Sequence, residues 1–354
     1  MTGNALSAAI RRLAAHESLD GPSVTSAFDV VMRGEATPTQ VAALLMGLRV
    51  KGETAEEIAG VVSALRAAMI VVPAVRPDEL VDTCGTGGGS ITTFNISTAA
   101  ALLAAGLGVR VAKHGNRSFT SRSGSADVLE ALGVTIEMSA SAMARTLHAA
   151  GIVFMFAPLM HPALRHVGPV RRELGVPTVM NIVGPLANPA QAGRQVVGVA
   201  EAARVPLLAE ALRVLGTRRA LVVHGAPGLD EISPLGLTDV IEVEHGSLRR
   251  WQIDPAICGV DAIRAADLAG EDPQTNAALI QSVLTGGGPP GARAAVILNA
   301  AAALYVGGHA TDFEVAVYAA AAGLRSGAGI TALDRLRAAS SAAASAAHDR
   351  PEAQ

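Results

Sequence analysis

Cysteine, aromatic residues and charged residues are all scarce in this sequence. Of its 354 residues, 2 are cysteine, 3% are aromatic and 17% are charged. Two cysteines, Cys84 and Cys258, are too few for a disulfide framework and suit a reducing compartment. The net charge of -3 argues against a general nucleic-acid-binding protein. We therefore expect a cytoplasmic globular protein without a nucleic-acid partner.

Long apolar runs and a secretory signal are also missing. The longest apolar run, from Ala99 to Leu107, is interrupted by Gly106 and followed by Arg110, so it is too short to span a bilayer. The chain does not open with the basic segment, apolar core and cleavage site of a signal peptide. We therefore expect no membrane partner. With 50% hydrophobic residues, the chain has enough apolar surface for a large core in one or two domains.

The periodicity of apolar residues divides the chain into an all-helical domain, residues 1–75, and an α/β domain, residues 76–337. Apolar residues at three- and four-residue spacing predict helices before residue 75. Beyond Leu80, short apolar runs alternate with helical stretches, which predicts a mostly parallel central sheet with helices on both faces. The predicted strands are 109–112, 134–136, 152–156, 196–199 and 220–223, and the predicted helices are 98–105, 126–132, 141–149, 205–215, 268–284 and 292–325. Residues 240–253 predict a hairpin, and the Ala/Ser-rich and then polar residues 338–354 predict a disordered tail.

The stretch from Val81 to Thr98 carries the strongest signal for a ligand. A short apolar run is followed by a glycine loop, which consists of Gly85, Gly87, Gly88 and Gly89. Asn95, Ser97 and Thr98 then precede an Ala/Leu run, which indicates a helix start capped by amide and hydroxyl groups. A strand, a glycine loop and a helix start present bare backbone N–H groups and the positive end of a helix to an anion. The stretch therefore predicts a phosphate-bearing ligand.

Two familiar phosphate loops do not fit this stretch. A Walker loop requires a lysine after the glycines, and none is present. The dinucleotide fingerprint fits Gly85 and Gly87 but has Ser90 at its last position, and the next strand ends at Lys113 instead of an acid. An ordinary tight strand-to-helix turn is the alternative interpretation.

Three further motifs follow predicted strands, so they could meet at one edge of the sheet. The basic motif, 113–127, combines Lys113 and Arg117 with hydroxyls and glycines, which suits pyrophosphate and a second phosphate. His161, Arg171 and the Gly/Pro turns up to 189 could hold an aromatic carboxylate. Each of these two motifs could instead be a solvated basic surface.

The fourth motif is the adjacent acid pair Asp230 and Glu231, which suits Mg2+ together with phosphate oxygens. A solvated acidic turn is the alternative. No His/Cys metal spacing and no nucleophile–base pattern is visible, and Cys84 has no indicated histidine partner, so we assign no catalytic residue.

These motifs, in this order, resemble the anthranilate phosphoribosyltransferase family of tryptophan biosynthesis. The matching segments are 82–88, 94–98, 113–117, 123–133, 161–163, 181–189 and 230–231, within a likeness that covers roughly residues 6–338. The resemblance implies transfer of the 5-phosphoribosyl group from phosphoribosyl pyrophosphate to the amine of anthranilate, with Mg2+ as cofactor. It also implies a homodimer formed through the helical domain, which takes in helices from about 165–190.

The resemblance also implies which residues bind each ligand. Phosphoribosyl pyrophosphate would bind the glycine loop, the helix start and the basic motif: Gly85, Gly87, Gly88, Gly89, Thr93, Asn95, Ile96, Ser97, Thr98, Lys113, His114, Gly115, Asn116, Arg117, Ser118, Phe119, Thr120, Ser121 and Ser125. Anthranilate would bind Gly85, His114, Asn116, His161, Arg171, Gly184 and Pro185. Mg2+ would bind Ser97, Asp230 and Glu231.

One departure and two alternatives accompany this interpretation. Many family members have Asp-Gly where this chain has Gly89-Ser90, which leaves only the backbone N–H at position 89. A nucleoside phosphorylase shares the expected fold, but its basic loop differs from Lys113-His114-Gly115-Asn116-Arg117. A non-enzymatic nucleic-acid-binding relative is the other alternative, and the acid pair and the net charge argue against it.

Overall fold

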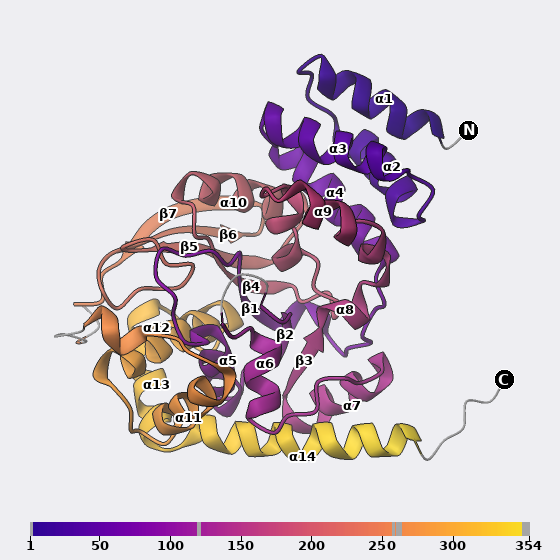
Figure 1. The fold of residues 1–354 in the computed structure, drawn as a ribbon. Helices are drawn as coiled ribbons and strands as arrows, with labels where there is room; N and C mark the ends of the chain where they lie inside the picture. The colour runs from indigo at the N-terminus through magenta and orange to yellow at the C-terminus, as the bar shows by residue number, and fades with distance from the viewer. Residues whose placement is uncertain (1–2, 119–121, 257–258, 260–263, 349–354) are drawn as a thin grey trace.

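The structure, a computed structural model, describes residues 3–118, 122–256, 259 and 264–348 and has two parts, one helical and one built on a seven-stranded sheet (Figure 1). The strands are β1 (Val81–Gly85), β2 (Val111–Gly115), β3 (Ile152–Phe156), β4 (Arg194–Gly198), β5 (Arg219–Gly225), β6 (Thr238–Glu244) and β7 (Ser247–Ile253). They lie in the order β3-β2-β1-β4-β5-β6-β7. Strands β1 to β5 run parallel, and the hairpin β6–β7 is antiparallel. The predicted α/β fold with a mostly parallel sheet and the predicted hairpin are confirmed.

The helical part consists of α1 (Gly3–Ala14), α2 (Gly21–Met32), α3 (Pro38–Lys51) and α4 (Ala55–Ala68). Thr37 and Thr54 start α3 and α4 with capping boxes, in which the side chains of Gln40 and Glu57 return the hydrogen bond. The segment between β3 and β4 contains α8 (Ala157–Met160) and α9 (Gly168–Leu174), and α9 packs against α3 (Figure 1). These contacts support the proposal that residues of about 165–190 join the helical domain.

Helices cover both faces of the sheet, as the alternation of the sequence predicts. Along β3, Phe154 packs into one core with α5 (Ile96–Gly106), α12 (Pro290–Gly307) and α13 (Phe313–Arg325), whereas Val153 packs into another core with α7 (Ala140–Ala150). On β5, Val222 faces α10 (Val205–Val214) and the helical part. Neighbouring residues therefore point to opposite faces, and both faces are buried, which explains the continuous apolar strands.

The remaining helices lie on the side of α5. These are α6 (Ser125–Ala131), α11 (Pro273–Leu284) and α14 (Ala328–His348), and α14 runs along the bottom of the view in Figure 1. The predicted helix over 292–325 is two helices, because Gly308 adopts a left-handed conformation that ends α12. The predicted helix over 268–284 begins at Pro273, after the cap Asp272.

Two predictions about local structure are wrong. Residues 134–136 form no strand, because their alternating burial arises from packing beside α14 and the Thr135 N–H donates to Oγ of Ser340 at 3.2 Å. The disordered tail predicted from residue 338 is helical as far as His348, since Ser340 and Ala343 are buried and the Ala343 carbonyl accepts from Arg145 at 3.0 Å. Among the described helices, none is long and apolar enough to cross a membrane.

Candidate active site

Four neighbouring strands end in glycine at the carboxyl edge of the sheet: Gly85, Gly115, Gly198 and Gly225. The turn that carries Asp230 and Glu231 lies directly on this edge. A Cβ atom on Gly198 would lie 1.6 Å from the Asp230 carbonyl oxygen, and one on Gly225 would lie 2.4 Å from that of Glu231. Glycine at the strand ends therefore admits the acid pair to the edge where parallel sheets bind ligands.

The glycine loop lies beside the acid pair. The Gly87 N–H donates to Oδ2 of Asp230 at 2.8 Å, and the Ser90 N–H donates to the Gly228 carbonyl at 3.0 Å. Gly87 and Gly88 have φ angles of 71° and 81°, which glycine adopts without strain. The structure thus brings together the predicted phosphate loop and the predicted metal ligands, although they are about 140 residues apart.

Helix α5 begins at this loop and directs its N-terminus at Glu231. The Ser97 N–H donates to Oε1 of Glu231 at 3.1 Å. Asn95 does not cap the helix as predicted, because its amide donates to the Ser123 carbonyl at 3.1 Å and its Oδ1 accepts from Asn276 at 3.1 Å. The Glu231 carboxylate therefore lies where an anion normally binds at the N-terminus of a helix.

Burial raises the pKa of both acids. The pKa of Glu231 is raised to about 8, first by burial and then by the charge of Asp230, while Lys113 acts in the opposite direction. Burial also raises the pKa of Asp230. Lys113 is itself buried, and its ammonium donates to the Thr83 carbonyl and to Oγ of Ser97, the latter at 3.1 Å. Two half-buried acids that repel one another, beside the hydroxyl oxygen of Ser97, fit a hard divalent cation.

The described part of the chain has no cluster of three or more His, Cys, Asp or Glu side chains that could hold a metal. A cation at this site would therefore depend on Asp230, Glu231, Ser97 and the oxygens of its ligand, which is the arrangement that Mg2+ prefers with phosphates. The donor set fits Mg2+ better than a softer metal such as Zn2+, because neither thiolate nor imidazole is present.

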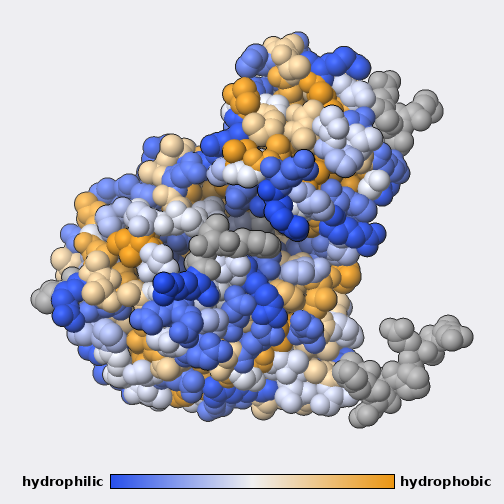
Figure 2. All heavy atoms as spheres, in the orientation of Figure 1, coloured by the Kyte–Doolittle hydropathy of each residue, from blue (hydrophilic) through white to orange (hydrophobic). Residues whose placement is uncertain are grey.

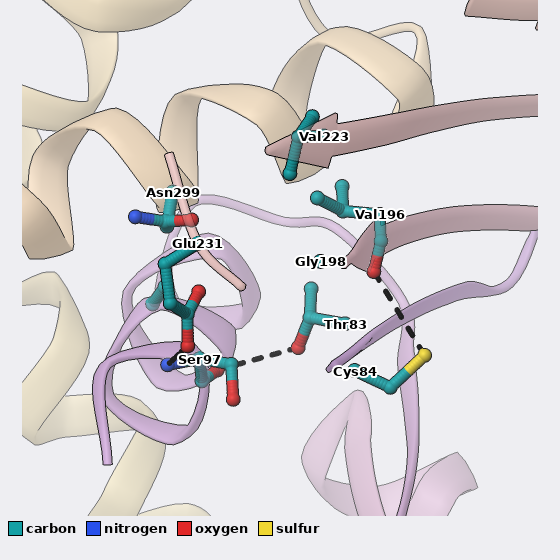
Figure 3. A pocket seen from close by; sticks show the side chains of 9 residues that line it. Thr83, Cys84, Ser97, Val196, Gly198, Val223, Glu231 and Asn299 are labelled. Atoms are coloured by element: carbon teal, nitrogen blue, oxygen red, sulfur yellow. Dashed lines mark hydrogen bonds between the residues drawn. The ribbon is translucent and has the colours of Figure 1, made fainter. Parts of the chain in front are cut away.

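A small cavity lies beside Glu231 (Figure 3). Glu231 and Ser97 line one side of it in this view, Cys84 and Val196 line the other, and Thr83 lies between them. Burial raises the pKa of the Cys84 thiol well above its ordinary value, so the thiol stays protonated. A nucleophilic role for Cys84 is therefore disfavoured, and Cys258 lies outside the described residues.

The basic motif is only partly directed at the glycine loop. The Arg117 guanidinium turns toward α6, where it bonds Oδ1 of Asp127 at 3.0 Å and both carboxylate oxygens of Glu130, and it stacks 5.4 Å over the ring of Phe156. Oδ1 of Asn116 accepts from the Arg117 N–H at 2.8 Å. The structure therefore does not place the Arg117 side chain in the predicted phosphate cradle.

The ends of the loop after β2 are held together by α6. The Ser118 and Gly124 N–H groups donate to Oδ2 of Asp127 at 3.3 and 2.9 Å. Ser125 donates its hydroxyl to the Asn116 carbonyl at 3.3 Å. Phe119, Thr120 and Ser121 lie outside the described residues.

Two buried histidines mark the predicted aromatic side of the site. The rings of His114 and His161 lie 5.0 Å apart, and both Nε2 atoms are buried without a hydrogen-bond partner. Burial lowers the pKa of His114 to about 3, with His161 and Lys113 adding to the shift and the Gly184 backbone opposing it. Burial lowers the pKa of His161 to about 4. Both rings are therefore neutral near pH 7 and have unused hydrogen-bonding atoms.

The remaining predicted residues of the aromatic side lie between β3 and β4. The Pro185 carbonyl accepts from Nε2 of Gln195 at 2.8 Å and lies 3.8 Å from Sγ of Cys84, which joins Gly184 and Pro185 to the end of β1. Arg171 is half-buried on α9 and donates from Nη2 to Oδ1 of Asn181 at 3.4 Å. Partial burial lowers the pKa of Arg171.

Two buried polar residues of this region were not predicted as site residues. Asp82 precedes the glycine loop on β1, and Asn188 follows Gly184 and Pro185. They are 0% and 2% exposed and bond each other. Asp82 is an acid within an apolar strand, and both residues lie in segments that carry the family resemblance, but neither signal identifies their partners.

Two family models match the chain over most of its length. The model described as "Glycosyl transferase family, a/b domain" matches residues 77–330, and the one described as "Glycosyl transferase family, helical bundle domain" matches residues 7–69. Among curated proteins, the anthranilate phosphoribosyltransferase of Rubrobacter xylanophilus is 49% identical over 327 residues, which covers 92% of this chain and 95% of the relative. That of Azorhizobium caulinodans is 47% identical over 336 residues and covers 95% and 96%.

Solved structures agree with these matches. The anthranilate phosphoribosyltransferase of Thermus thermophilus is 40% identical with a TM-score of 0.88, over 94% of this chain and 99% of its own. The Saccharomyces cerevisiae enzyme in complex with PRPP and Mg is 26% identical with a TM-score of 0.86, over 95% and 98%. The predicted family resemblance is confirmed: the chain belongs to the anthranilate phosphoribosyltransferase family.

Proposed function

We propose that this glycosyltransferase moves the 5-phosphoribosyl group of phosphoribosyl pyrophosphate to the amine of anthranilate and releases pyrophosphate. The observation that carries the proposal is the meeting of the glycine loop, the acid pair and the His114–His161 pair at one edge of the sheet. One side of this edge offers N–H groups and oxygens for a metal-bound diphosphate. The other offers two neutral imidazole rings for an aromatic acid.

The phosphate side would consist of the glycine loop, the start of α5 and the motif after β2. Glycine leaves the backbone N–H groups open to phosphate oxygens, and the N-terminus of α5 adds a positive potential. Asp230, Glu231 and Ser97 would hold Mg2+, which the yeast relative contains together with PRPP. Bound there, the ion would neutralise charge on the departing pyrophosphate.

The aromatic side would orient anthranilate. A second structure of the yeast relative contains 4-fluoroanthranilate. Arg171, Asn116 and the unpartnered imidazole nitrogens of His114 and His161 are the donors we propose for the carboxylate and the amine. The Gly184–Pro185 turn, fixed by Gln195, would form the wall against the ring.

The reaction requires no strong base. The lone pair of the aniline nitrogen forms a bond to C1 of the ribose while the C1–oxygen bond to pyrophosphate breaks, and the nitrogen then loses a proton. His114 and His161 are neutral near pH 7, so they can orient the uncharged amine without protonating it. Positioning and stabilisation of the leaving charge supply the rate enhancement.

Anthranilate fluorescence provides the test. We expect fluorescence to fall when the protein, phosphoribosyl pyrophosphate and Mg2+ are present together. No fall, or phosphorolysis of nucleosides instead, would contradict the proposal.

The homodimer and the cytoplasmic location remain predictions from the family resemblance. Sedimentation velocity of the full chain should give twice the mass of one chain if it is a homodimer. A single-chain mass at micromolar concentration would contradict the homodimer.

A further inference from the structure

Strands β1 and β2, which lead into the two phosphate motifs, separate after a single residue pair. Val81 pairs with Val111, and the Val81 N–H donates to the Arg110 carbonyl at 2.9 Å. By contrast, β1 pairs with β4 along all of Val81–Gly85, and β2 pairs with β3 along all of Val111–Gly115. The separation is therefore confined to the gap between β1 and β2, where the sheet opens toward its carboxyl edge.

Side chains take over the hydrogen bonds that a continued ladder would have made. In a regular parallel pair, the Ala112 carbonyl would accept from Thr83, and the His114 N–H would donate to the Thr83 carbonyl. Here the Ala112 carbonyl accepts from Nδ2 of Asn188 at 2.9 Å, and the His114 N–H donates to Oδ1 of Asp82 at 3.1 Å. The Thr83 carbonyl accepts from the Lys113 ammonium. The gap is thus closed by side chains and leaves these buried backbone groups satisfied.

Asp82 and Asn188 form the centre of this arrangement. Nδ2 of Asn188 donates to Oδ2 of Asp82 at 2.7 Å. Oδ1 of Asn188 accepts from the N–H groups of Ala190 at 2.9 Å and of Ala192 at 3.4 Å. Both side chains are buried, and both oxygens of Asp82 are bonded. A fully bonded buried network of this kind permits one geometry, because any shift would leave a polar group unpaired.

This pair touches three segments of the active site. Asp82 lies on the strand that ends at Gly85, and it holds the backbone of His114, whose ring lies against His161. Asn188 terminates the turn that carries Pro185. We propose that Asp82 and Asn188 are positioning residues that hold β1 and β2 apart and fix the phosphate side of the site relative to the aromatic side. The inference rests on the proposed function, since the two sides are defined by its two substrates.

A pair with this role affects both substrates together. Transfer requires the amine nitrogen and C1 of the ribose to meet in line, and a small displacement of one side lowers the rate even when each ligand still binds. Loss of the pair should therefore lower kcat more than it raises either KM. Loss of a contact to one ligand would instead raise the KM of that ligand alone.

The test is a reciprocal exchange. In Asp82→Asn, the oxygen for His114 remains, but the new amide faces the amide of Asn188, so the pair is broken without a change in size. We expect kcat at pH 8 to fall at least tenfold while the circular dichroism spectrum is unchanged. When Asn188→Asp is added, the amide at position 82 faces a carboxylate at position 188, so a donor again faces an acceptor. We expect kcat of this double variant to be at least fivefold higher than that of Asp82→Asn alone. Recovery stays incomplete because Ala112 still lacks its donor.

A buried acid away from the site supplies the control. Glu57 is 0% exposed in the helical part and accepts from Leu19 at 2.8 Å and Thr54 at 2.9 Å. Glu57→Gln removes a buried charge just as Asp82→Asn does, so it should lower thermal stability and leave kcat within twofold. A tenfold fall in kcat for Glu57→Gln would show that the assay reports general destabilisation and would overturn the inference.

The remaining outcomes are also decisive. An Asp82→Asn variant with kcat within twofold of wild type, or a folded double variant no better than the single one, would overturn the positioning role. If Asp82→Asn does not fold, a folded and active double variant still supports the pair, and a folded but inactive double variant overturns it. If neither variant folds, the pair is required for folding and the positioning role is overturned. If the wild-type protein does not consume anthranilate, the proposed function itself is contradicted. This outcome is seen without any substitution, so it is distinct from a failure of the positioning role.

Discussion

Glu231 is a half-buried acid that makes the stability of the unliganded protein depend on pH. Its pKa is about 8 in the fold and 4.5 in the reference state, so folding favours its protonated form. The stabilising contribution is complete below pH 4.5 and is lost as the pH rises to 8, with a total on the order of a few kcal/mol. Glu231→Gln cannot ionise and should escape this loss.

The comparison is made in EDTA at pH 5 and pH 8.5 by thermal unfolding. We expect Glu231→Gln to unfold at a higher temperature than wild type at pH 8.5 and the difference to shrink at pH 5. An equal difference at both pH values would contradict the raised pKa. Activity of the same variant should fall at least tenfold at saturating Mg2+, because a proposed metal ligand is gone.

Arg171 and Lys113 provide the residue-level test of the two substrate sides. Arg171→Ala should raise the KM for anthranilate by roughly one to two powers of ten, if one charge-assisted hydrogen bond of about 1.5–3 kcal/mol is lost. The KM for phosphoribosyl pyrophosphate should change much less. Lys113→Ala should have the opposite bias, because its ammonium bonds Ser97 beside the acid pair.

Steady-state kinetics with each substrate varied in turn measures both effects, and circular dichroism confirms folding. Equal weakening of both substrates by both variants would show that the two sides are not separable. If Arg171→Ala changed the KM of neither substrate, the alternative interpretation would hold, in which this segment is a solvated basic surface without a ligand.

Among the helices and strands, prediction succeeded where the pattern of apolar residues within the segment was enough to determine its structure. The strand Ile152–Phe156 was predicted with its observed bounds, because all five of its residues are buried and apolar. Residues 134–136 have the alternation of a strand but bond to a helix, and periodicity does not reveal the partner. The Ala/Ser-rich end has the composition of a tail, yet a few small buried residues are enough to fix it as a helix on α7.

The candidate site was also predicted only in part. The glycine loop, the basic motif and the acid pair are contiguous in sequence, so residue types alone indicated their chemistry. The Asp82–Asn188 bond joins residues 106 positions apart, and the Arg117 guanidinium turns to a helix that follows it. Neither contact follows from local spacing, because both depend on how separate elements pack.

Helix α14 offers a test of its own. Ending the chain after Ala338 removes the buried Ser340 and the carbonyl that accepts from Arg145. We expect the free energy of unfolding to fall by about 2–4 kcal/mol, from two hydrogen bonds and the lost packing on α7. Urea denaturation measures the change, and Ser341→Ala, an exposed neighbour, is the control that should have no effect. Unchanged stability of the shortened chain would contradict the observed packing of α14.

In the whole molecule, three residues of the proposed aromatic side, His161, Arg171 and Pro185, lie in the segment between β3 and β4, which contacts both parts. This segment contains α9, which packs on α3, and the turn at Pro185, which contacts β4 through Gln195. Arg66 of α4 also bonds the Leu186 carbonyl, at 3.1 Å from Nε and 2.7 Å from Nη2. Hydrophilic side chains border the junction of the two parts on the face shown in Figure 2. The helical part therefore contacts the segment that carries Arg171 and Pro185.

The proposed reaction joins a phosphoribosyl group to anthranilate at this site. It is tested by following anthranilate fluorescence with purified protein while pyrophosphate release is measured in parallel. With phosphoribosyl pyrophosphate and Mg2+ both present, fluorescence should fall and one pyrophosphate should appear for each anthranilate consumed. Omitting either component should abolish both signals. Unchanged fluorescence with all components present, or a fall that does not require phosphoribosyl pyrophosphate, would contradict the proposed reaction.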